Sequence, residues 1–375
     1  MKSEHRYLIL IVIILLICQT VPAYAAGEPY VSADAAVLMD ARTGQVLYER
    51  NPHKRRAPAS TTKIMTALLA LEIGRMDQLV TVSPQAARVE GSSIYLQQGE
   101  QISFADLVSG ALIKSGNDAC AAIAEYIAGG IGGFAELMNL KAIAIGAWDT
   151  HFVNPHGLPA REHYTTAYDL GLIAVHALRN EKFAEIVSTR EKTIDGPGEG
   201  WDRRLTNTNQ MLWKYNWADG VKTGTTSEAG QCLVTSASKD SRRLVAVVLR
   251  SGDRYVDTIK MLEYGFDNFE HRQVTVAGEV LRMLPVREGM SDRVAVKFAA
   301  DLAVLVPKNR PEALEIETEI TPTLAAPVLK GQKVGMLKVN VDGRTIGNVE
   351  LVASAAVPER TWWRMFKKWV SDIKY

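Results

Sequence analysis

The sequence is poor in the residues and patterns that indicate metal binding or nucleic-acid binding. It holds three cysteines in 375 residues, and no Cys/His cluster has the spacing of a zinc site. Lys and Arg number 43 against 42 Asp and Glu, so the formal net charge is +1. Nucleic-acid binding therefore has no electrostatic support. No segment is of low complexity, and we expect neither a metal site nor a nucleic-acid partner.

Long apolar runs are also scarce, and the clearest one lies near the N-terminus. Lys2 and Arg6 precede an apolar run over residues 8–18, and Ala23-Tyr24-Ala25 then gives a small-x-small cleavage pattern. This pattern is typical of a secretory signal peptide. The alternative is an uncleaved membrane anchor, but a spanning helix needs roughly 20 residues. We expect residues 1–25 to be a signal peptide and the mature chain to be exported.

The predicted export determines which cysteines the mature chain keeps and whether a disulfide can form between them. Cys18 would leave with the signal peptide, whereas Cys120 and Cys232 would remain in a compartment where disulfides form. Because each of these two lies in an apolar run, we favour two separate buried thiols over a bridge.

The remaining chain of about 350 residues suggests two domains. An apolar content of 47% over the whole chain allows a full core. Strand-like and helix-like segments alternate in the first part, whereas the second part contains strand-like runs. We expect an α+β domain over residues 26–271, a small all-β domain over 272–356 and a separate element over 357–375.

The pattern of the first domain predicts strands packed with helices. Two strand-like runs joined by a glycine-containing turn indicate a hairpin. Residues 61–73 are apolar on nearly all sides of a helix, as in a helix buried at the centre of a large domain. Ser103 and Thr166 are placed to cap two further helices, the first of which should stop at Gly116. The expected strands are 35–40, 45–49, 220–225, 231–238 and 243–249, and the expected helices are 61–73, 103–114, 118–128, 134–145 and 167–178.

The second domain reads as all-β. Its runs either alternate between apolar and polar residues or are continuously apolar, and Asp342-Gly343 is typical of a hairpin turn. The expected strands are 280–286, 293–298, 303–306, 314–320, 333–341 and 345–352.

Three short motifs in a fixed order carry the chemistry of the chain. They are Ser60-Thr61-Thr62-Lys63, Ser115-Gly116-Asn117 and Lys222-Thr223-Gly224. Together they supply a nucleophile, a proton-handling lysine, a polar relay and a cation, the set used by serine acyl-transfer enzymes. Ser-x-x-Lys also occurs at Ser236 and Ser371, but both copies follow the Lys-Thr-Gly motif. Ser60 alone heads the motifs in the correct order.

Ser60 and Lys63 suit nucleophilic catalysis. A serine alcohol is a weak nucleophile until a base takes its proton. Lys63 lies one helical turn beyond Ser60, on the same face. Among apolar neighbours the lysine ammonium should lose its proton more easily, which makes a neutral Lys63 a candidate general base. A serine N-cap beside an ordinary lysine is the alternative, and the two companion motifs argue against it.

The other two motifs suit substrate handling. Ser115 would relay protons to the leaving group, and Asn117 would hold Lys63 and a substrate amide. Lys222 and Thr223 offer a cation and a hydroxyl for a free carboxylate, and Gly224 leaves room for a substrate backbone. Backbone N–H groups of Ser60 and Thr225 are candidates for an oxyanion hole. Alone, Ser115-Gly116-Asn117 would be interpreted as a glycine-containing helix stop, and Lys222-Thr223-Gly224 as a solvated turn.

Segments outside the three motifs also resemble a known family. Residues 37–44 and 60–67, Asn154-Pro155-His156-Gly157-Leu158 and Asp219–Gly224 resemble the D-alanyl-D-alanine carboxypeptidases, low-molecular-weight penicillin-binding proteins that trim peptidoglycan stem peptides. The resemblance covers roughly residues 30–270. It implies a β-lactamase/transpeptidase-like fold in which helices flank an antiparallel sheet. It also implies that Ser60 attacks the bond between two D-alanines, that β-lactams acylate Ser60, and that no zinc or organic cofactor is required.

Four positions of the resembling region need an individual interpretation. Some relatives carry His where this chain has Thr225, but an oxyanion hole needs only the backbone there. The family uses an arginine near the substrate carboxylate, and we favour Arg254 over Arg250. His156 lies in a Pro/Gly setting that favours a structural role, and Asp169 reads as a helix cap or support.

The C-terminal segment predicts a membrane-surface helix. Trp362, Phe366, Trp369, Val370 and Ile373 recur at helical spacing, and cations fall largely on other faces. Docking on its own domain is the alternative. We expect residues 357–375 to bind the outer face of the cytoplasmic membrane as a peripheral anchor.

Three rival functions remain open from the sequence. A serine β-lactamase would share the motifs, but no convincing Glu-x-x-x-Asn element lies between residues 150 and 200. A D,D-endopeptidase is closer in chemistry. A catalytically silent wall-binding protein is disfavoured by the intact Ser60, Lys63 and Lys222.

Overall fold

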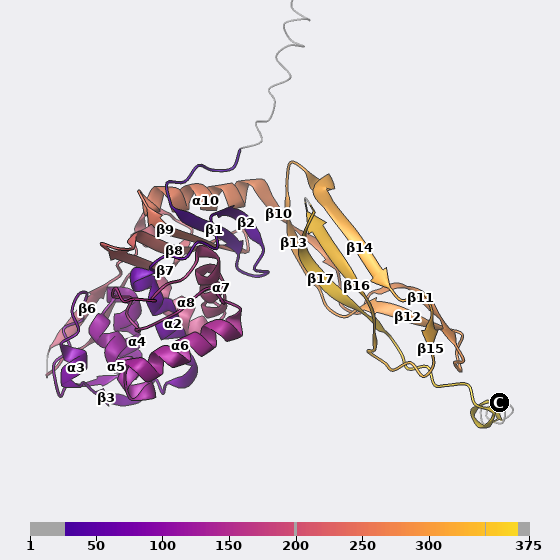
Figure 1. The fold of residues 1–375 in the computed structure, drawn as a ribbon, viewed down its shortest axis with the longest axis horizontal. Helices are drawn as coiled ribbons and strands as arrows, with labels where there is room; N and C mark the ends of the chain where they lie inside the picture. Colours follow the sequence, from indigo (N-terminus) through magenta and orange to yellow (C-terminus); the bar gives the residue numbers. More distant parts are fainter. Residues whose placement is uncertain (1–26, 199–200, 342, 367–375) are drawn as a thin grey trace, which may run out of the picture.

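A computed structural model describes residues 27–198, 201–341 and 343–366. Figure 1 shows a larger part of mixed helices and strands and, beside it, an elongated part built of strands. The predicted signal peptide lies outside the described residues, as do Ser371 and residues 367–375 of the predicted C-terminal helix.

Five antiparallel strands form the central sheet of the larger part, in the order β2-β1-β9-β8-β7. The strands are β1 (Ala35–Asp40), β2 (Val46–Arg50), β7 (Ala218–Thr226), β8 (Gly230–Lys239) and β9 (Arg242–Ser251). Two short hairpins lie outside this sheet, β3 (Leu79–Thr81) with β4 (Gln101–Ser103) and β5 (Glu191–Asp195) with β6 (Asp202–Thr206). The strand predictions for the sheet are confirmed, and β7 is one of its two edges.

Both faces of the central sheet are buried. Successive side chains of β1 point to opposite faces and join two different apolar clusters. Ala35, Val37 and Met39 join the larger cluster, and Ala36 and Leu38 join the smaller one. Helix α10 covers the smaller cluster, and most other helices pack on the opposite face (Figure 1). The α-helices are α2 (Lys63–Ile73), α3 (Pro84–Ala87), α4 (Phe104–Ser109), α5 (Asn117–Ala128), α6 (Ile131–Ile145), α7 (Ala167–Ala177), α8 (Glu181–Ser188), α9 (Met211–Lys214) and α10 (Arg254–Asn268).

The helix caps were predicted correctly, and one helix ends in an unexpected geometry. The side chains of Ser103 and Thr166 accept hydrogen bonds from backbone N–H groups three residues on, as expected. However, α4 ends at Ser109 and continues as the π-helical segment η2 (Gly110–Lys114). Ser115 then takes the left-handed conformation, with φ +67°. The helical segment therefore ends at Lys114, as expected, but the left-handed residue that ends it is Ser115 and not Gly116. Gly116 is needed for space, because a Cβ there would lie 2.7 Å from Asp118 Oδ1.

The elongated part is all-β, as predicted. Six strands form one sheet in the order β14-β16-β17-β12-β11-β15, and β10 pairs with β13. The short 3-10 turn η3 (Pro311–Ala313) precedes β14. The strands are β10 (Phe269–Thr275), β11 (Val280–Arg287), β12 (Arg293–Phe298), β13 (Leu302–Pro307), β14 (Leu314–Ile320), β15 (Leu324–Ala325), β16 (Lys333–Val341) and β17 (Arg344–Ala353).

The two parts are joined by more than a linker. Strand β10 follows α10 directly, so the boundary expected between residues 271 and 272 falls inside this strand. The side-chain amide of Gln45 donates to the carbonyl of Leu305 at 2.7 Å and accepts from its N–H at 2.8 Å. Arg344 forms an ion pair with Glu49 at 3.0 Å. These contacts fix the β part against the hairpin of β1 and β2.

The described residues contain neither a single helix suited to crossing a membrane nor a cluster of side chains suited to holding a metal ion. No single described helix has both the length and the apolar character to cross a membrane; α5 and α6 pass the test only as a pair bent by 84°. Within the same residues, no group of three His, Cys, Asp or Glu side chains is placed to hold a metal ion. Cys120 and Cys232 are both buried and unpaired, as expected.

Candidate active site

Ser60 lies in a 3-10 turn, η1 (Ala59–Thr62), that leads directly into α2. Ser60 is partly exposed, whereas Lys63 is fully buried. Lys63 Nζ lies 2.9 Å from Ser60 Oγ. Burial disfavours the ammonium and lowers the pKa of Lys63 to about 8. The expected pairing of a serine with a lysine that loses its proton easily is present.

Two further acceptors orient the Lys63 amine. Asn117 Oδ1 lies 2.7 Å and the carbonyl oxygen of His156 lies 2.8 Å from Nζ. The three acceptors account for the three N–H bonds of a lysine ammonium. In the neutral amine one of these positions becomes a lone pair, and the Ser60 hydroxyl is the partner that can donate to it.

The loop at residues 154–158 presents that carbonyl. The Asn154 amide accepts from the N–H of Gly157 at 2.7 Å and donates to the carbonyl of Leu158 at 2.9 Å. Gly157 has φ +84°, and a Cβ there would lie 1.9 Å from the carbonyl oxygen of Ala59. The pKa of the His156 ring falls to about 3 because the ring is buried. His156 therefore contributes a backbone carbonyl and a neutral ring, in line with the expected structural role.

The backbone is strained next to Ser60. Ala59 has φ +49°, a left-handed conformation that non-glycine residues rarely adopt. Such strain concentrates at functional sites, where the surrounding structure holds the residue in place.

Ser115 and Asn117 stand at the junction of η2 and α5. Asn117 is the first residue of α5, and its Nδ2 donates to the carbonyl of Glu90 at 2.6 Å. The structure brings Asn117 to Lys63 as predicted. Ser115 is buried, but within the described residues its hydroxyl makes no hydrogen bond to Lys63 or Ser60.

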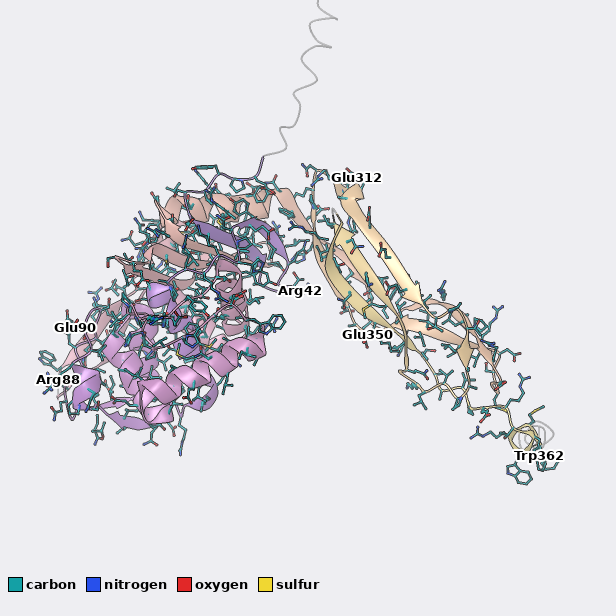
Figure 2. All side chains as sticks on the ribbon, viewed as in Figure 1. Arg42, Arg88, Glu90, Glu312, Glu350 and Trp362 are labelled. Carbon is teal, nitrogen blue, oxygen red and sulfur yellow. The ribbon has the colours of Figure 1, made fainter. Side chains whose placement is uncertain are left out.

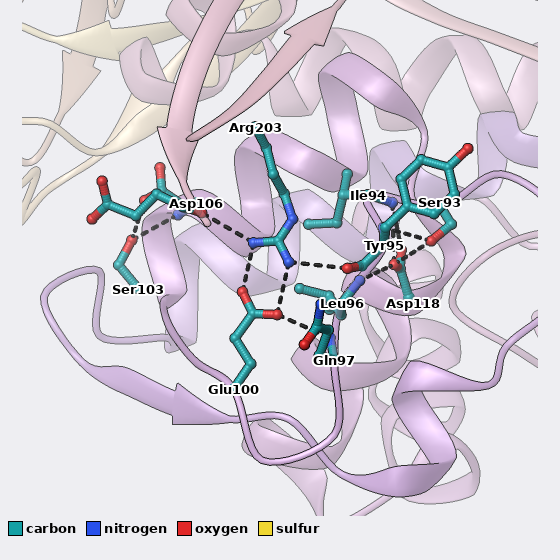
Figure 3. Close-up of polar contacts among 11 residues, drawn as sticks. Ser93, Ile94, Tyr95, Leu96, Gln97, Glu100, Ser103, Asp106, Asp118 and Arg203 are labelled. Carbon is teal, nitrogen blue, oxygen red and sulfur yellow. Dashed lines mark hydrogen bonds and ion pairs between the residues drawn. The ribbon is translucent and has the colours of Figure 1, made fainter. Parts of the chain in front are cut away.

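The loop that carries Glu90 is fastened by two buried acidic residues (Figure 3). Asp118 accepts from the N–H groups of Ile94 and Leu96 at 3.1 Å each. Glu100 forms a two-pronged ion pair with Arg203, at 2.5 and 2.7 Å, and the same guanidinium donates to the carbonyl of Tyr95 at 3.0 Å. Arg203 belongs to β6, so its guanidinium, drawn in Figure 3, joins the loop to the β5–β6 hairpin.

Lys222 is a second buried lysine at the site. It lies on β7 and donates to the carbonyl of Thr223 at 3.2 Å and to the Thr208 hydroxyl at 3.4 Å. The Thr208 and Thr223 hydroxyls lie 3.1 Å apart. Burial, and then the charge of Lys63, hold the pKa of Lys222 well below its ordinary value. Within the described residues no carboxylate compensates Lys222, which suits a site for an anionic group.

Gly224 brings β7 against the nucleophile. A Cβ on Gly224 would lie 2.9 Å from the backbone nitrogen of Ser60. Any side chain there would therefore displace the chain at Ser60. Arg254, the first residue of α10, donates to the carbonyl of Gly224 at 3.0 Å and to Thr225 Oγ1 at 2.8 Å. Within the described residues Arg250 makes no such contact, and it lines a pocket beside the β7–β8 turn.

Asp169 and Ser236 complete the sequence candidates. The Asp169 carboxylate accepts from the N–H of Asp149 and from the Thr150 hydroxyl, both at 2.8 Å, which is the expected supporting role. Ser236 is fully buried in β8, out of reach of a substrate.

Comparison with known proteins decides the family. The model of the D-alanyl-D-alanine carboxypeptidase family matches residues 23–252. The chain belongs to the D-alanyl-D-alanine carboxypeptidase family. A second model, the C-terminal domain of penicillin-binding protein 5, matches residues 269–359 of this carboxypeptidase.

Individual relatives of this carboxypeptidase agree along most of its length. It is 34% identical to the D-alanyl-D-alanine carboxypeptidase DacF of Bacillus subtilis, covering 91% of this chain and 90% of the relative. It is also 34% identical to DacA of Escherichia coli, covering 93% and 88%. The crystal structure of penicillin-binding protein 5 from Haemophilus influenzae superposes with a TM-score of 0.80 at 33% identity, covering 89% of this chain and all of that one.

These findings confirm the resemblance drawn from the motifs. The protein is a serine-type D-Ala-D-Ala carboxypeptidase with a transpeptidase-like catalytic domain and an all-β C-terminal domain. Family membership implies peptidoglycan peptides as substrates, β-lactams as ligands and the cell envelope as the compartment.

Sequence reasoning missed the residues that join the site from distant segments. Thr208 precedes β7 by ten residues and has no motif of its own. Glu90 contributes only a carbonyl, which no side-chain pattern reveals. Asp118 directly follows the Ser115-Gly116-Asn117 motif, and its acidic side chain at the start of α5 was the one local signal available.

Proposed function

We propose that Ser60 is the acyl-ester nucleophile of this carboxypeptidase and that neutral Lys63 is its general base. The observation that carries the proposal is the 2.9 Å contact between Lys63 Nζ and Ser60 Oγ, in a place where burial brings the pKa of the lysine to about 8. A base with a pKa near the working pH is the one that transfers protons efficiently.

The reaction takes place in two steps. In the first, Lys63 takes the Ser60 proton while Oγ attacks the carbonyl between the two D-alanines, and backbone N–H groups of Ser60 and Thr225 stabilise the oxyanion. The C–N bond then breaks, and the proton passes to the departing D-alanine amine. In the second step, water attacks the ester and Ser60 recovers its proton.

Ser115 relays the proton to the leaving amine in this scheme. Its hydroxyl makes no hydrogen bond to Lys63 here, and the amine already has three partners. The relay therefore forms when substrate displaces one of those partners. Catalytic hydrogen bonds often tighten only in the substrate complex.

The carboxylate of the terminal D-alanine binds at Lys222, Thr223 and Thr225. Lys222 lies without a compensating carboxylate, so a substrate anion would relieve an unfavourable buried charge. Arg254 lies at Gly224 and Thr225 and supports this end of the strand. A β-lactam presents a carbonyl and a carboxylate in the same relation and would acylate Ser60.

Attachment to the outer face of the cytoplasmic membrane is the second part of the proposal. The described start of the C-terminal helix, residues 362–366, exposes four large apolar side chains, Trp362, Trp363, Met365 and Phe366. Tryptophan at the headgroup level is typical of interfacial helices. The predicted signal peptide supports export to that side.

Fluorescent penicillin tests the catalytic assignment. The mature enzyme should take the label and release D-alanine from a pentapeptide, and Ser60→Ala should do neither. Ser236→Ala is the matched control, because Ser236 heads a second Ser-x-x-Lys run but is buried in β8. Labelling of the Ser60→Ala variant would overturn the assignment, and rapid loss of the label would indicate a β-lactamase.

A further inference from the structure

Arg250 occupies an unusual position at the end of β9. The pairing of β8 with β9 shifts register between Gln231 and Leu233, and Arg250 in this bulge has φ +51°. A bulge of this kind redirects a side chain and is common beside active sites. Gly230 has φ +66°, and a Cβ there would lie 3.2 Å from Arg250 Cγ. The backbone of both strands is thus arranged around this arginine.

The Arg250 side chain lines a pocket of about 620 Å³. Three other arginines of the pocket are already engaged: Arg55 with Asp149, Arg56 with Asp34, and Arg161 beside Glu162. Among the described residues, Arg250 is the pocket arginine without an ion pair. The remaining lining residues are Ala57, Pro159, Ala160, His163, Tyr164, Glu228 and Ala229.

The pocket reaches the end of strand β7, because Glu228 and Ala229 of the β7–β8 turn line it. Strand β7 is a sheet edge, so an extended peptide can pair along it. With the terminal carboxylate at Lys222, the rest of the peptide runs past Thr225 and Thr226 toward the β7–β8 turn, where Glu228 and Ala229 form the pocket wall. An extended chain advances about 3.3 Å per residue, so the residue before the two D-alanines lies level with this turn.

We propose that Arg250 forms a second anion subsite, which binds a side-chain carboxylate on the residue that precedes the two D-alanines. Glu228 gives the same pocket a negative charge, so the preferred group carries an ammonium beside its carboxylate, as in the head group of an amino acid. The proposal rests on the catalytic direction assigned above, in which Lys222 binds the terminal carboxylate.

Two pentapeptides that differ in one carboxylate test the subsite. The residue before the D-alanines is 2,6-diaminopimelate in one and lysine in the other, so both side chains end in an amine. The ratio of their kcat/KM values cancels any loss of folded enzyme. We expect the enzyme to favour the diaminopimelate peptide by about threefold to tenfold, the effect of one partly exposed charge-assisted hydrogen bond.

Substitutions then assign the preference to Arg250. Arg250→Gln should bring the ratio close to one, and Arg250→Lys should keep it above one. Arg282→Gln removes an exposed arginine of the β domain and should leave the ratio unchanged. A native ratio near one, or a preference that survives Arg250→Gln, would overturn the subsite alone. Failure to release D-alanine from either peptide would overturn the proposed function as well.

Discussion

At the scale of single residues, the candidate site is defined by two buried lysines that form no ion pair with any carboxylate of the described residues. Lys63 and Lys222 are both almost fully buried, and burial lowers the pKa of each. A buried cation is unfavourable for folding unless it is compensated. In the proposed mechanism this cost serves two purposes: Lys63 acts as the base, and Lys222 binds the substrate anion.

The lowered pKa of Lys63 predicts the pH dependence of acylation. The neutral amine is the active form, so its fraction rises with pH through a pKa of about 8. About a tenth of Lys63 is neutral one pH unit below its pKa and about nine-tenths one unit above it. The second-order rate of penicillin acylation, measured from pH 6 to 10, should therefore increase and level off above pH 9. A rate that is flat over this range would exclude Lys63 as the base.

Lys222→Met should increase the stability of the folded protein and decrease its carboxypeptidase activity. Methionine keeps an unbranched side chain but removes an uncompensated buried charge, which we expect to raise the free energy of unfolding by about 1–3 kcal/mol. The same change removes the cation for the substrate carboxylate, so kcat/KM should fall. Thermal unfolding and D-alanine release measure the two effects. Lys330→Met, at an exposed position, is the control and should alter neither; a less stable Lys222→Met variant would contradict this account.

At the scale of elements, the loop over residues 88–97 connects Lys63, the proposed base, to the β5–β6 hairpin. Glu90 holds the Asn117 amide, Asn117 holds Lys63, and the Glu100–Arg203 pair fastens the far end of the loop (Figure 3). The position of Asn117 thus depends on an ion pair that touches neither serine nor lysine.

Arg203→Ala should therefore weaken both fold and activity. It leaves the Glu100 carboxylate buried and unpaired, a cost of about 3–5 kcal/mol. Arg204→Ala is a matched control on the same strand, because the Arg204–Glu191 pair is largely exposed to solvent and contributes little to stability. The melting temperature and kcat per penicillin-titrated site should fall for the first variant and barely change for the second. Equal effects would contradict a role of the buried pair.

These elements show which structural features the local sequence could predict and which it could not. The cap at Ser103 and the sheet strands were predictable because their signals lie within a few residues. Arg203 and Glu100 are 103 residues apart, and only the folded chain brings them together. Helix α10 was missed although Asp253 caps it, a local signal that was available. Strand β10 was missed because its polar sequence forms a strand through pairing with β13.

The candidate site follows the same rule. Ser60, Lys63 and Lys222 lie in short motifs whose residue types and spacing indicate their chemistry. The left-handed Ser115, the Thr208 hydroxyl and the bulge at Arg250 depend on how distant strands meet. Motifs therefore predicted which candidate groups the structure brings together, whereas the structure was needed to find the groups that position them.

At the scale of the whole molecule, the β domain separates the candidate active site from the start of the C-terminal helix. Figure 2 places Glu90, beside the catalytic site, at the edge of the catalytic part opposite the β domain, and Trp362 at the far tip of that domain. The Gln45–Leu305 hydrogen bonds and the Arg344–Glu49 ion pair fix the joint between them. A chain anchored at Trp362 would therefore hold the catalytic site at a distance from the membrane surface.

Removal of residues 358–375 tests this arrangement. The truncated mature chain keeps the catalytic domain and the strands of the β domain, so it should bind penicillin normally while moving from the membrane fraction to the soluble fraction. In the full-length chain, Trp362→Ser with Phe366→Ser removes two exposed apolar side chains but keeps the tail, and should weaken binding to vesicles that contain anionic lipid. High salt should weaken the binding further, because part of it is electrostatic. Unchanged membrane association of the truncated mature chain would show that the anchor lies elsewhere, and the spacing function of the β domain would lose its basis.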